Sequence, residues 1–191
     1  MRTLIICGFL SFVLLTNCFS QGNRFSIKSG LGYYVDIISM DDGPIIWLEG
    51  GCRLKTGFII NGRVSMASME WELSNGAFKD FRTVQLRQMA DLVFSRQIKL
   101  TGSNYFEPGL GFKLKKEYFL YPDVDEIYNG GVYYQDVSYS QIFYEIGFTI
   151  CLDYYYQFES NFYMGLRADT NVIWALGFEG LSVTPIFGFR F

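Results

Sequence analysis

Apolar and polar residues alternate with a period of two along most of the chain after residue 20. In the stretch Phe25–Ile37, the odd positions are mostly apolar and the even positions are mostly small or charged. Seven further segments repeat the alternation, and they begin at Ile46, Phe58, Val84, Phe106, Ile142, Phe162 and Val183. Side chains two residues apart lie on the same face of a β-strand. The sequence therefore predicts about eight strands and an all-β fold.

Charged residues keep to one phase of these eight segments. The positions of the apolar phase contain no Asp, Glu, Lys or Arg, whereas the opposite phase carries most of the strand charges. A charged group on the lipid face of a transmembrane barrel costs about 2 to 4 kcal/mol at the bilayer midplane. The segregation therefore predicts a single antiparallel transmembrane β-barrel, with the apolar phase toward lipid and the charged phase toward the lumen.

The charged phase supplies a candidate lumen network. Its members are Lys28, Asp36, Glu49, Arg53, Arg63, Arg87, Asp91, Glu107, Lys113, Glu145, Asp153, Arg167, Asp169 and Arg190. The network holds seven acidic and seven basic side chains, so its charges can nearly neutralise one another. We expect salt bridges to plug the narrow lumen of an eight-stranded barrel, with a polar channel as the alternative.

The lengths of the connections between segments predict an orientation. Short turns are expected at Lys55–Gly57, Thr101–Asn104 and Glu159–Asn161. Longer connectors follow the third and fifth segments, a pattern that places both termini at the periplasmic rim of an outer-membrane barrel. The longest connector is expected at about Tyr121–Ser138, and its Tyr128, Tyr133 and Tyr134 are candidate contacts for an external partner. Within the fifth segment, Pro108 predicts a position without a ladder N–H.

The first twenty residues have the pattern of a cleaved signal peptide. Arg2 precedes an apolar run, Leu4–Leu15, and a polar region that ends at Ser20. This run is shorter than the roughly 20 residues that a membrane-spanning helix needs. We therefore expect residues 1–20 to be a signal peptide and residues 21–191 to be the barrel domain. A lipoprotein signal acylated at Cys18 is the alternative.

The cysteines and the bulk composition narrow the picture further. Cys52 and Cys151 fall on opposite phases, so we interpret both as small apolar fillers rather than as a disulfide. The net charge of -3 offers no basic surface for nucleic acid. Aromatic residues make up 19% of the chain, as in barrels with interfacial girdles. The candidate girdle residues are Tyr33, Trp47, Trp71, Tyr105, Tyr118, Tyr154, Tyr155, Tyr156 and Trp174.

Histidine is absent from the chain, which excludes a Ser-His nucleophile. No phosphate-binding glycine loop, zinc motif or EF-hand spacing occurs either. The acidic stretches Asp41–Gly43 and Asp123–Glu126 lack the ordered spacing of a calcium loop and are interpreted as solvated loop charge. We therefore expect no catalytic residues, no cofactor and no metal site.

The C-terminal stretch Thr184–Phe191 resembles the final strand of outer-membrane β-barrel proteins. The resemblance implies that Phe187, Phe189 and Phe191 form the signal that the barrel-assembly machinery recognises. With the signal peptide and the strand count, the chain resembles the small OmpA/OmpX-like barrels without a periplasmic domain. This resemblance implies a bacterial outer-membrane location with lipid around the barrel.

These observations favour a non-enzymatic integral outer-membrane barrel with a structural or surface-interaction role. A narrow pore or a transporter of small hydrophobic ligands is the first alternative. A secreted, soluble, lipocalin-like barrel is the second, although the first strand contains no Gly-x-Trp motif.

Overall fold

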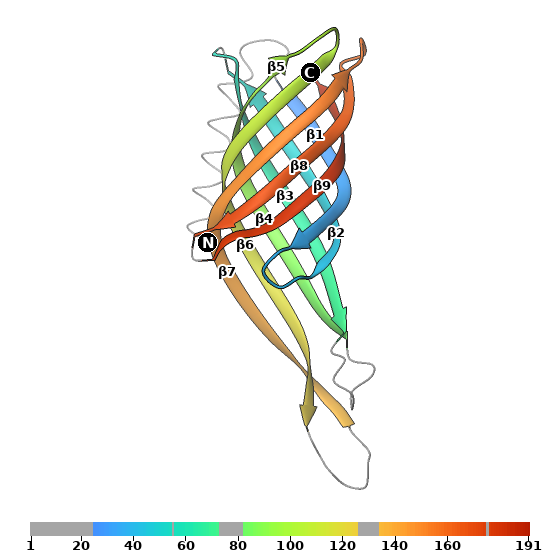
Figure 1. Cartoon of the computed structure of the whole chain (residues 1–191), viewed down its shortest axis with the longest axis vertical. Helices are drawn as coiled ribbons and strands as arrows, with labels where there is room; N and C mark the ends of the chain where they lie inside the picture. The colour runs from blue at the N-terminus through green and yellow to red at the C-terminus, as the bar shows by residue number, and fades with distance from the viewer. Residues whose placement is uncertain (1–24, 55, 73–81, 126–133, 175) are drawn as a thin grey trace.

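Eight long strands and one two-residue strand make up the computed structural model, which describes residues 25–54, 56–72, 82–125, 134–174 and 176–191 (Figure 1). The strands are β1 (Phe25–Asp36), β2 (Asp42–Arg53), β3 (Phe58–Glu72), β4 (Arg82–Arg96), β5 (Ile98–Lys99), β6 (Asn104–Asp125), β7 (Tyr134–Gln157), β8 (Phe162–Ile173) and β9 (Gly177–Arg190). The described part of the chain contains no helix long and apolar enough to cross a membrane. The predicted signal segment, residues 1–20, lies outside the described residues.

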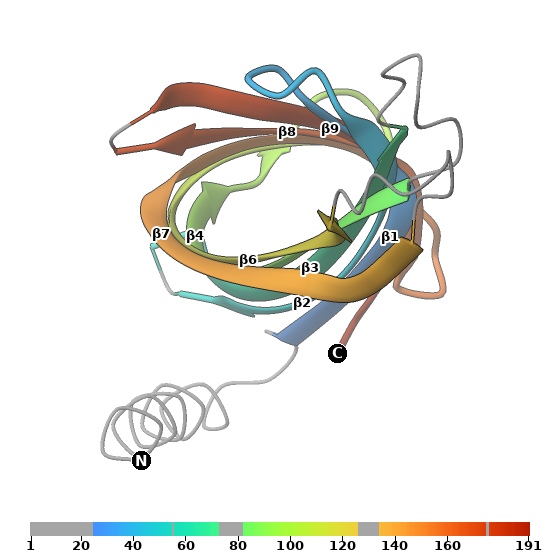
Figure 2. The same cartoon turned by 90° about the horizontal axis from the view of Figure 1, so that it is seen from below.

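The long strands close into an antiparallel barrel, which Figure 2 shows end-on. Pairing of β1 with β9 and of β4 with β6 completes the ring. One circuit along paired residues leads from Ser26 through Gly51, Asn61, Val93, Gly111, Thr149, Asn171 and Gly180 to Asp36. The circuit returns to β1 ten residues beyond its start, and such a stagger corresponds to a strand tilt of about 40°. The predicted fold class is confirmed.

The short strand β5 is the continuation of β4 past a break in the ladder. β4 pairs with β6 as far as Ser95 opposite Gly109, and β5 resumes in the same register with Ile98 opposite Phe106. Pro108 lies in this gap, and proline has no N–H to donate to a ladder. The prediction for Pro108 is confirmed, and the ring contains eight strands although nine are assigned.

The two sets of alternating side chains lie on the faces predicted for them, the charged set inside the barrel and the apolar set outside. Along β1, Lys28 is 2% exposed, whereas Leu31 is 62% exposed. The same contrast recurs around the ring, so that exposed apolar side chains such as Leu48, Val64 and Leu110 form a belt on the outer surface. Most charged side chains of the strands face inward, whereas Arg96 and Lys116 lie on the outward phase against the rings of Phe58 and Tyr118. An outer surface of this kind is suited to lipid, because in water it would expose a continuous apolar area.

The rim at which β1 begins and β9 ends, here the terminal rim, carries tight turns. Between β2 and β3 the Leu54 amide donates to the Phe58 carbonyl at 2.7 Å, and Gly57 has a φ of 85°. Asn161, with a φ of 62°, closes the turn between β7 and β8. Positive φ is readily adopted by Gly and Asn, which explains both residues. The short turns expected here are confirmed.

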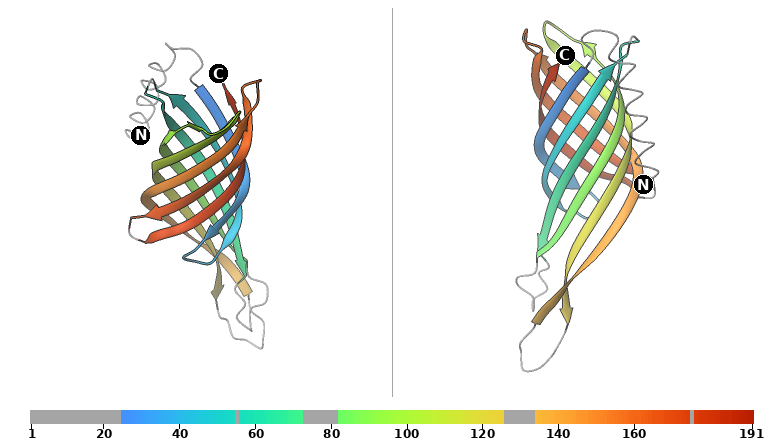
Figure 3. Two further views of the ribbon diagram at one scale, coloured as in Figure 1. Left: turned by 45° about the horizontal axis from the view of Figure 1, so that its top comes forward. Right: turned by 180° about the vertical axis from the view of Figure 1, so that it is seen from behind.

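At the opposite rim, here the distal rim, β6 and β7 extend beyond the other strands (Figures 1 and 3). The predicted connector Tyr121–Ser138 is wrong, because paired strand continues to Asp125 opposite Tyr134. A register shift at Asp123/Val124 interrupts this ribbon. β4 accompanies β6 only as far as Leu120, so residues 121–125 and 134–139 form a two-stranded ribbon, here the distal hairpin.

Candidate functional site

Charged side chains from all eight long strands meet inside the barrel in three clusters of ion pairs. The terminal cluster contains Lys28, Glu49, Glu107, Asp153 and Arg167. The central cluster contains Arg63, Asp91, Lys113 and Asp169. The distal cluster contains Asp36, Arg87, Lys115, Glu117, Glu145 and Glu179.

The terminal cluster is built around two cations. Lys28 Nζ lies 2.7 Å from Glu107, 3.0 Å from Asp153 and 3.2 Å from Glu49. The guanidinium of Arg167 makes two hydrogen bonds to Asp153, at 2.6 and 2.7 Å, and two to Glu49, at 2.8 and 3.0 Å. Paired bonds of this kind use the planar geometry of both groups and are the strong form of a charge-assisted hydrogen bond.

Aromatic side chains pack against this cluster inside the barrel. Trp47 is buried, donates through Nε1 to Thr184 at 3.0 Å and lies under the Arg167 guanidinium at 4.2 Å. Tyr155 is buried as well and donates to Glu107 at 2.9 Å. The prediction that Trp47, Tyr105 and Tyr155 belong to an outer girdle is wrong, because all three occupy the inward phase of their strands and Tyr105 stacks on Tyr155. Trp174, at 81% exposure, does lie on the outer surface.

The central cluster spans the middle of the lumen. Arg63 contacts Asp91 at 2.9 Å and Asp169 at 2.5 Å, and it donates to Thr149 at 3.1 Å. Lys113 Nζ approaches the second oxygen of Asp91 at 2.9 Å. All four charged members are buried, and their two positive charges match their two negative charges. Their mutual contacts offset the cost of removing these charges from water.

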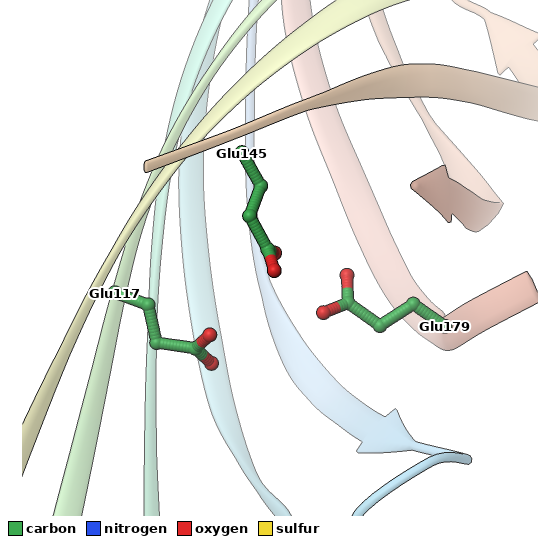
Figure 4. A group of neighbouring side chains, drawn as sticks. All are labelled: Glu117, Glu145 and Glu179. Carbon is green, nitrogen blue, oxygen red and sulfur yellow. The ribbon is translucent and has the colours of Figure 1, made fainter. Parts of the chain in front are cut away.

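The distal cluster brings four carboxylates to two cations near the distal rim. Arg87 bonds Asp36 and Glu117 and lies 3.7 Å from Glu179. Lys115 Nζ contacts Glu117 at 3.2 Å, Glu145 at 2.5 Å and Glu179. Figure 4 shows the Glu117, Glu145 and Glu179 carboxylates directed toward one another from β6, β7 and β9. One oxygen from each lies within 4.8 Å of the others.

The structure brings most of the expected network residues together. Twelve of the fourteen make interior ion pairs, and they are Lys28, Asp36, Glu49, Arg63, Arg87, Asp91, Glu107, Lys113, Glu145, Asp153, Arg167 and Asp169. Arg53 is half-buried at the end of β2, outside the three clusters. Arg190 lies at the terminal rim and donates to Gln157 at 3.0 Å and to Tyr155 at 3.3 Å.

Three members of the distal cluster are missing from the sequence-based set. Lys115 and Glu117 continue the inward phase of Lys113 along β6, so counting two and four residues onward reaches them. Glu179 escaped because it lies at a register shift: Asn171 pairs with Gly180 and Val172 with Phe178, so Glu179 is buried although it shares the phase of the exposed Leu181. The clusters therefore hold nine carboxylates and six cations, and the excess negative charge lies mainly in the distal cluster.

A cavity of about 10 Å³ lies beside the central cluster, and its lining includes Arg63, Lys113 and Asp169. One water molecule needs about 10 to 15 Å³ of such space, so this cavity has room for about one water.

Cys151 is a buried free thiol inside the barrel, whereas Cys52 is disulfide-bonded. The two cysteines do not pair with each other, but the interpretation of Cys52 as a simple filler is wrong.

The remaining candidate site residues lie away from the lumen. Phe187, Phe189 and Phe191 are exposed on the outer surface, and the rings of Phe189 and Phe191 lie 5.0 Å apart. Their role as an assembly signal stays a prediction. Tyr134 begins β7 opposite Asp125, while Tyr128 and Tyr133 lie outside the described residues. The acidic stretch at Asp123 continues β6, so it is not a loop.

Solved structures share this architecture at low sequence identity. Ail, the attachment invasion locus protein of Yersinia pestis, in complex with the heparin analogue sucrose octasulfate, matches with a TM-score of 0.57 and 10% identity, over 90% of this chain and 100% of that chain. OprG, an outer-membrane protein of Pseudomonas aeruginosa, matches with a TM-score of 0.52 and 12% identity, over 88% of this chain and 96% of that chain. No protein-family model and no curated protein matches the chain. The chain has the fold of the small eight-stranded outer-membrane barrels.

Proposed function

We propose that the protein is a non-enzymatic, non-conducting barrel of the bacterial outer membrane that holds the distal hairpin outside the cell for contact with a partner. The extension of β6 and β7 beyond every other strand carries this proposal. In the membrane, the terminal rim faces the periplasm and the distal rim faces outward, as is usual for barrels of this fold. The apolar belt between the rims contacts the lipid.

The distal hairpin offers a surface that the barrel itself does not use. β8 pairs with β7 only from Gly147 onward, so among the described residues the β7 side of the distal hairpin, residues 134–139, pairs with β6 alone. Unpaired edges present backbone N–H and C=O groups that an extended peptide can bind. The proposed partner is therefore a protein that contributes an extended segment.

The ion-paired interior supports a scaffold in preference to a pore. The three clusters cross the lumen at successive levels, and the cavity beside the central cluster has room for about one water. Continuous conduction needs a connected water path, so buried ion pairs at three levels support a lumen that does not conduct. The inward charges and the outward apolar belt also disfavour a soluble, lipocalin-like barrel, whose interior would be apolar.

Shortening the distal hairpin tests the proposed role. Replacing residues 123–137 with Asn-Gly joins Pro122 to Ser138, a pair that the native ladder already contains. We expect the shortened protein to keep its heat-dependent shift in SDS gels, because the ring of eight strands is intact. Adherence of cells that display it to epithelial monolayers should fall to the level of cells without the protein. Equal adherence of the two forms would refute the proposed role.

Cys151 provides a test of the closed lumen. In a Cys52→Ser background it is the remaining cysteine of residues 21–191. We expect the folded protein to resist a small anionic methanethiosulfonate and to react after boiling in SDS, because Cys151 is 2% exposed. Planar bilayers containing the protein should show no stepwise conductance. Rapid labelling together with defined current steps would favour the narrow pore.

A further inference from the structure

The distal cluster is the part of the lumen whose charges do not balance. Asp36, Glu117, Glu145 and Glu179 face Arg87 and Lys115, which leaves two negative charges in excess. The central cluster is balanced, and the terminal cluster exceeds balance by one carboxylate. Uncompensated charge away from water is costly unless a counterion or a proton neutralises it. The excess at the distal cluster equals the charge of one divalent cation.

Two buried oxygen atoms of the distal cluster and its neighbour Gln85 have free acceptor capacity. Glu179 is 2% exposed, and its Oε2 accepts no hydrogen bond from the described residues. Gln85 is not a member of the acidic group, yet its amide donates to Glu117 while its own buried Oε1 accepts no hydrogen bond from that part of the chain. Buried oxygens without partners are exceptions that call for an explanation. A cation supplies the missing partner for both atoms.

The spacing and the chemistry fit a hard cation. Two oxygens on opposite sides of Ca²⁺ are about 4.8 Å apart, since each Ca–O bond is about 2.4 Å long. The oxygens of Glu117, Glu145 and Glu179 lie within 4.8 Å of one another, and carboxylate and amide oxygens are ligands that Ca²⁺ uses. The side chain of Glu145 is 24% exposed, so the position is open to solvent from the distal rim.

We propose that the distal end of the lumen binds one Ca²⁺ ion through Glu117, Glu145 and Glu179, with Gln85 as an additional oxygen ligand. The Lys115 ammonium contacts all three carboxylates and competes with the ion for them. Arg87 stays bound to Asp36 and Glu117 and holds the remaining charge. The site pins β6, β7 and β9 together at the base of the distal hairpin.

Isothermal titration with CaCl₂ tests the site on the full barrel, purified in detergent and freed of metal with chelator. We expect one Ca²⁺ per chain. Glu145→Gln and Glu179→Gln should each weaken binding by about tenfold or more, because each removes one unit of ligand charge. Lys115→Gln should tighten binding severalfold by removing the competing ammonium. The heat-dependent gel shift verifies folding, and Glu145, the more exposed carboxylate, decides the matter if Glu179→Gln does not fold.

The acidic pair Asp41, which is half-buried, and Asp42, which is exposed, provides the matched control. The double variant Asp41→Asn/Asp42→Asn removes two negative charges near the same rim and should bind Ca²⁺ as the parent does. Absence of binding at millimolar CaCl₂, or equal affinity in Glu145→Gln and the parent, would overturn the site. Weaker binding in Lys115→Gln would overturn the competing role of Lys115. A preference for MgCl₂ over CaCl₂ would overturn the assignment of the ion.

Discussion

Arg167→Met is expected to lower the free energy of unfolding by about 3 to 5 kcal/mol, as when one partner of a buried ion pair is removed. Arg167 makes four hydrogen bonds to Glu49 and Asp153, and all three side chains are buried. Without the guanidinium, these carboxylates retain only Lys28, which also contacts Glu107. Urea unfolding in lipid vesicles, followed by tryptophan fluorescence, measures the change.

Arg53→Met is the matched control for this substitution. It makes the same change of side chain at a half-buried position of β2, outside the three clusters. We expect its free energy of unfolding to stay within about 0.5 kcal/mol of the parent, as for most substitutions away from buried networks. Similar losses in the two variants would mean that Arg167 stabilises the barrel through its net charge or its bulk, and not through its paired contacts with Glu49 and Asp153.

The inward set was predictable because each position in a strand fixes the face of its side chain. Because residues an even number of positions apart in a strand share a face, Lys28 and Asp36 of β1 must lie on the same side as Tyr34. The pairing of particular ions was not predictable, since it depends on how far the strands are staggered around the ring. Arg167 on β8 reaches Glu49 on β2 across the lumen. No local sequence pattern predicts that these two side chains are close in space.

The period-two pattern did not predict strand where the two faces of the strand no longer meet different surroundings. Within the wall, lipid on one side and charged lumen on the other impose a period of two on β6 and β7. Beyond Leu120 both faces of the ribbon lie outside the wall, so Tyr121–Asp125 need not alternate. The pairing there is carried by the backbone, which leaves little mark on the sequence. The distal hairpin was therefore mistaken for a loop.

Residue type predicts the wrong location where it conflicts with the phase of the alternation. Trp47 has the composition of a girdle residue, but it lies on the same phase as Glu49 and is buried against Arg167. Its neighbours Ile46 and Leu48 are exposed in the apolar belt on the outer surface. The period of two is the stronger signal, because a strand cannot turn one side chain to the other face without shifting its register.

Leu110→Arg is expected to lower the free energy of unfolding by about 2 to 4 kcal/mol in lipid vesicles, the cost of Arg on the lipid face near the midplane. Leu110 is 58% exposed on β6, and its partners Phe94 and Ile150 are exposed apolar residues as well. Urea unfolding of the variant and the parent measures this loss.

Leu100→Arg separates lipid from water as the surroundings of these leucines. Leu100 is 51% exposed, close to the value for Leu110, but it lies in the terminal-rim turn between β5 and β6. At a rim the same substitution should cost only about 0 to 1 kcal/mol. If both leucines faced water, both substitutions would fall within about 0.5 kcal/mol of the parent, as exposed substitutions do. A large loss confined to Leu110→Arg is therefore the result that only a lipid-embedded belt produces.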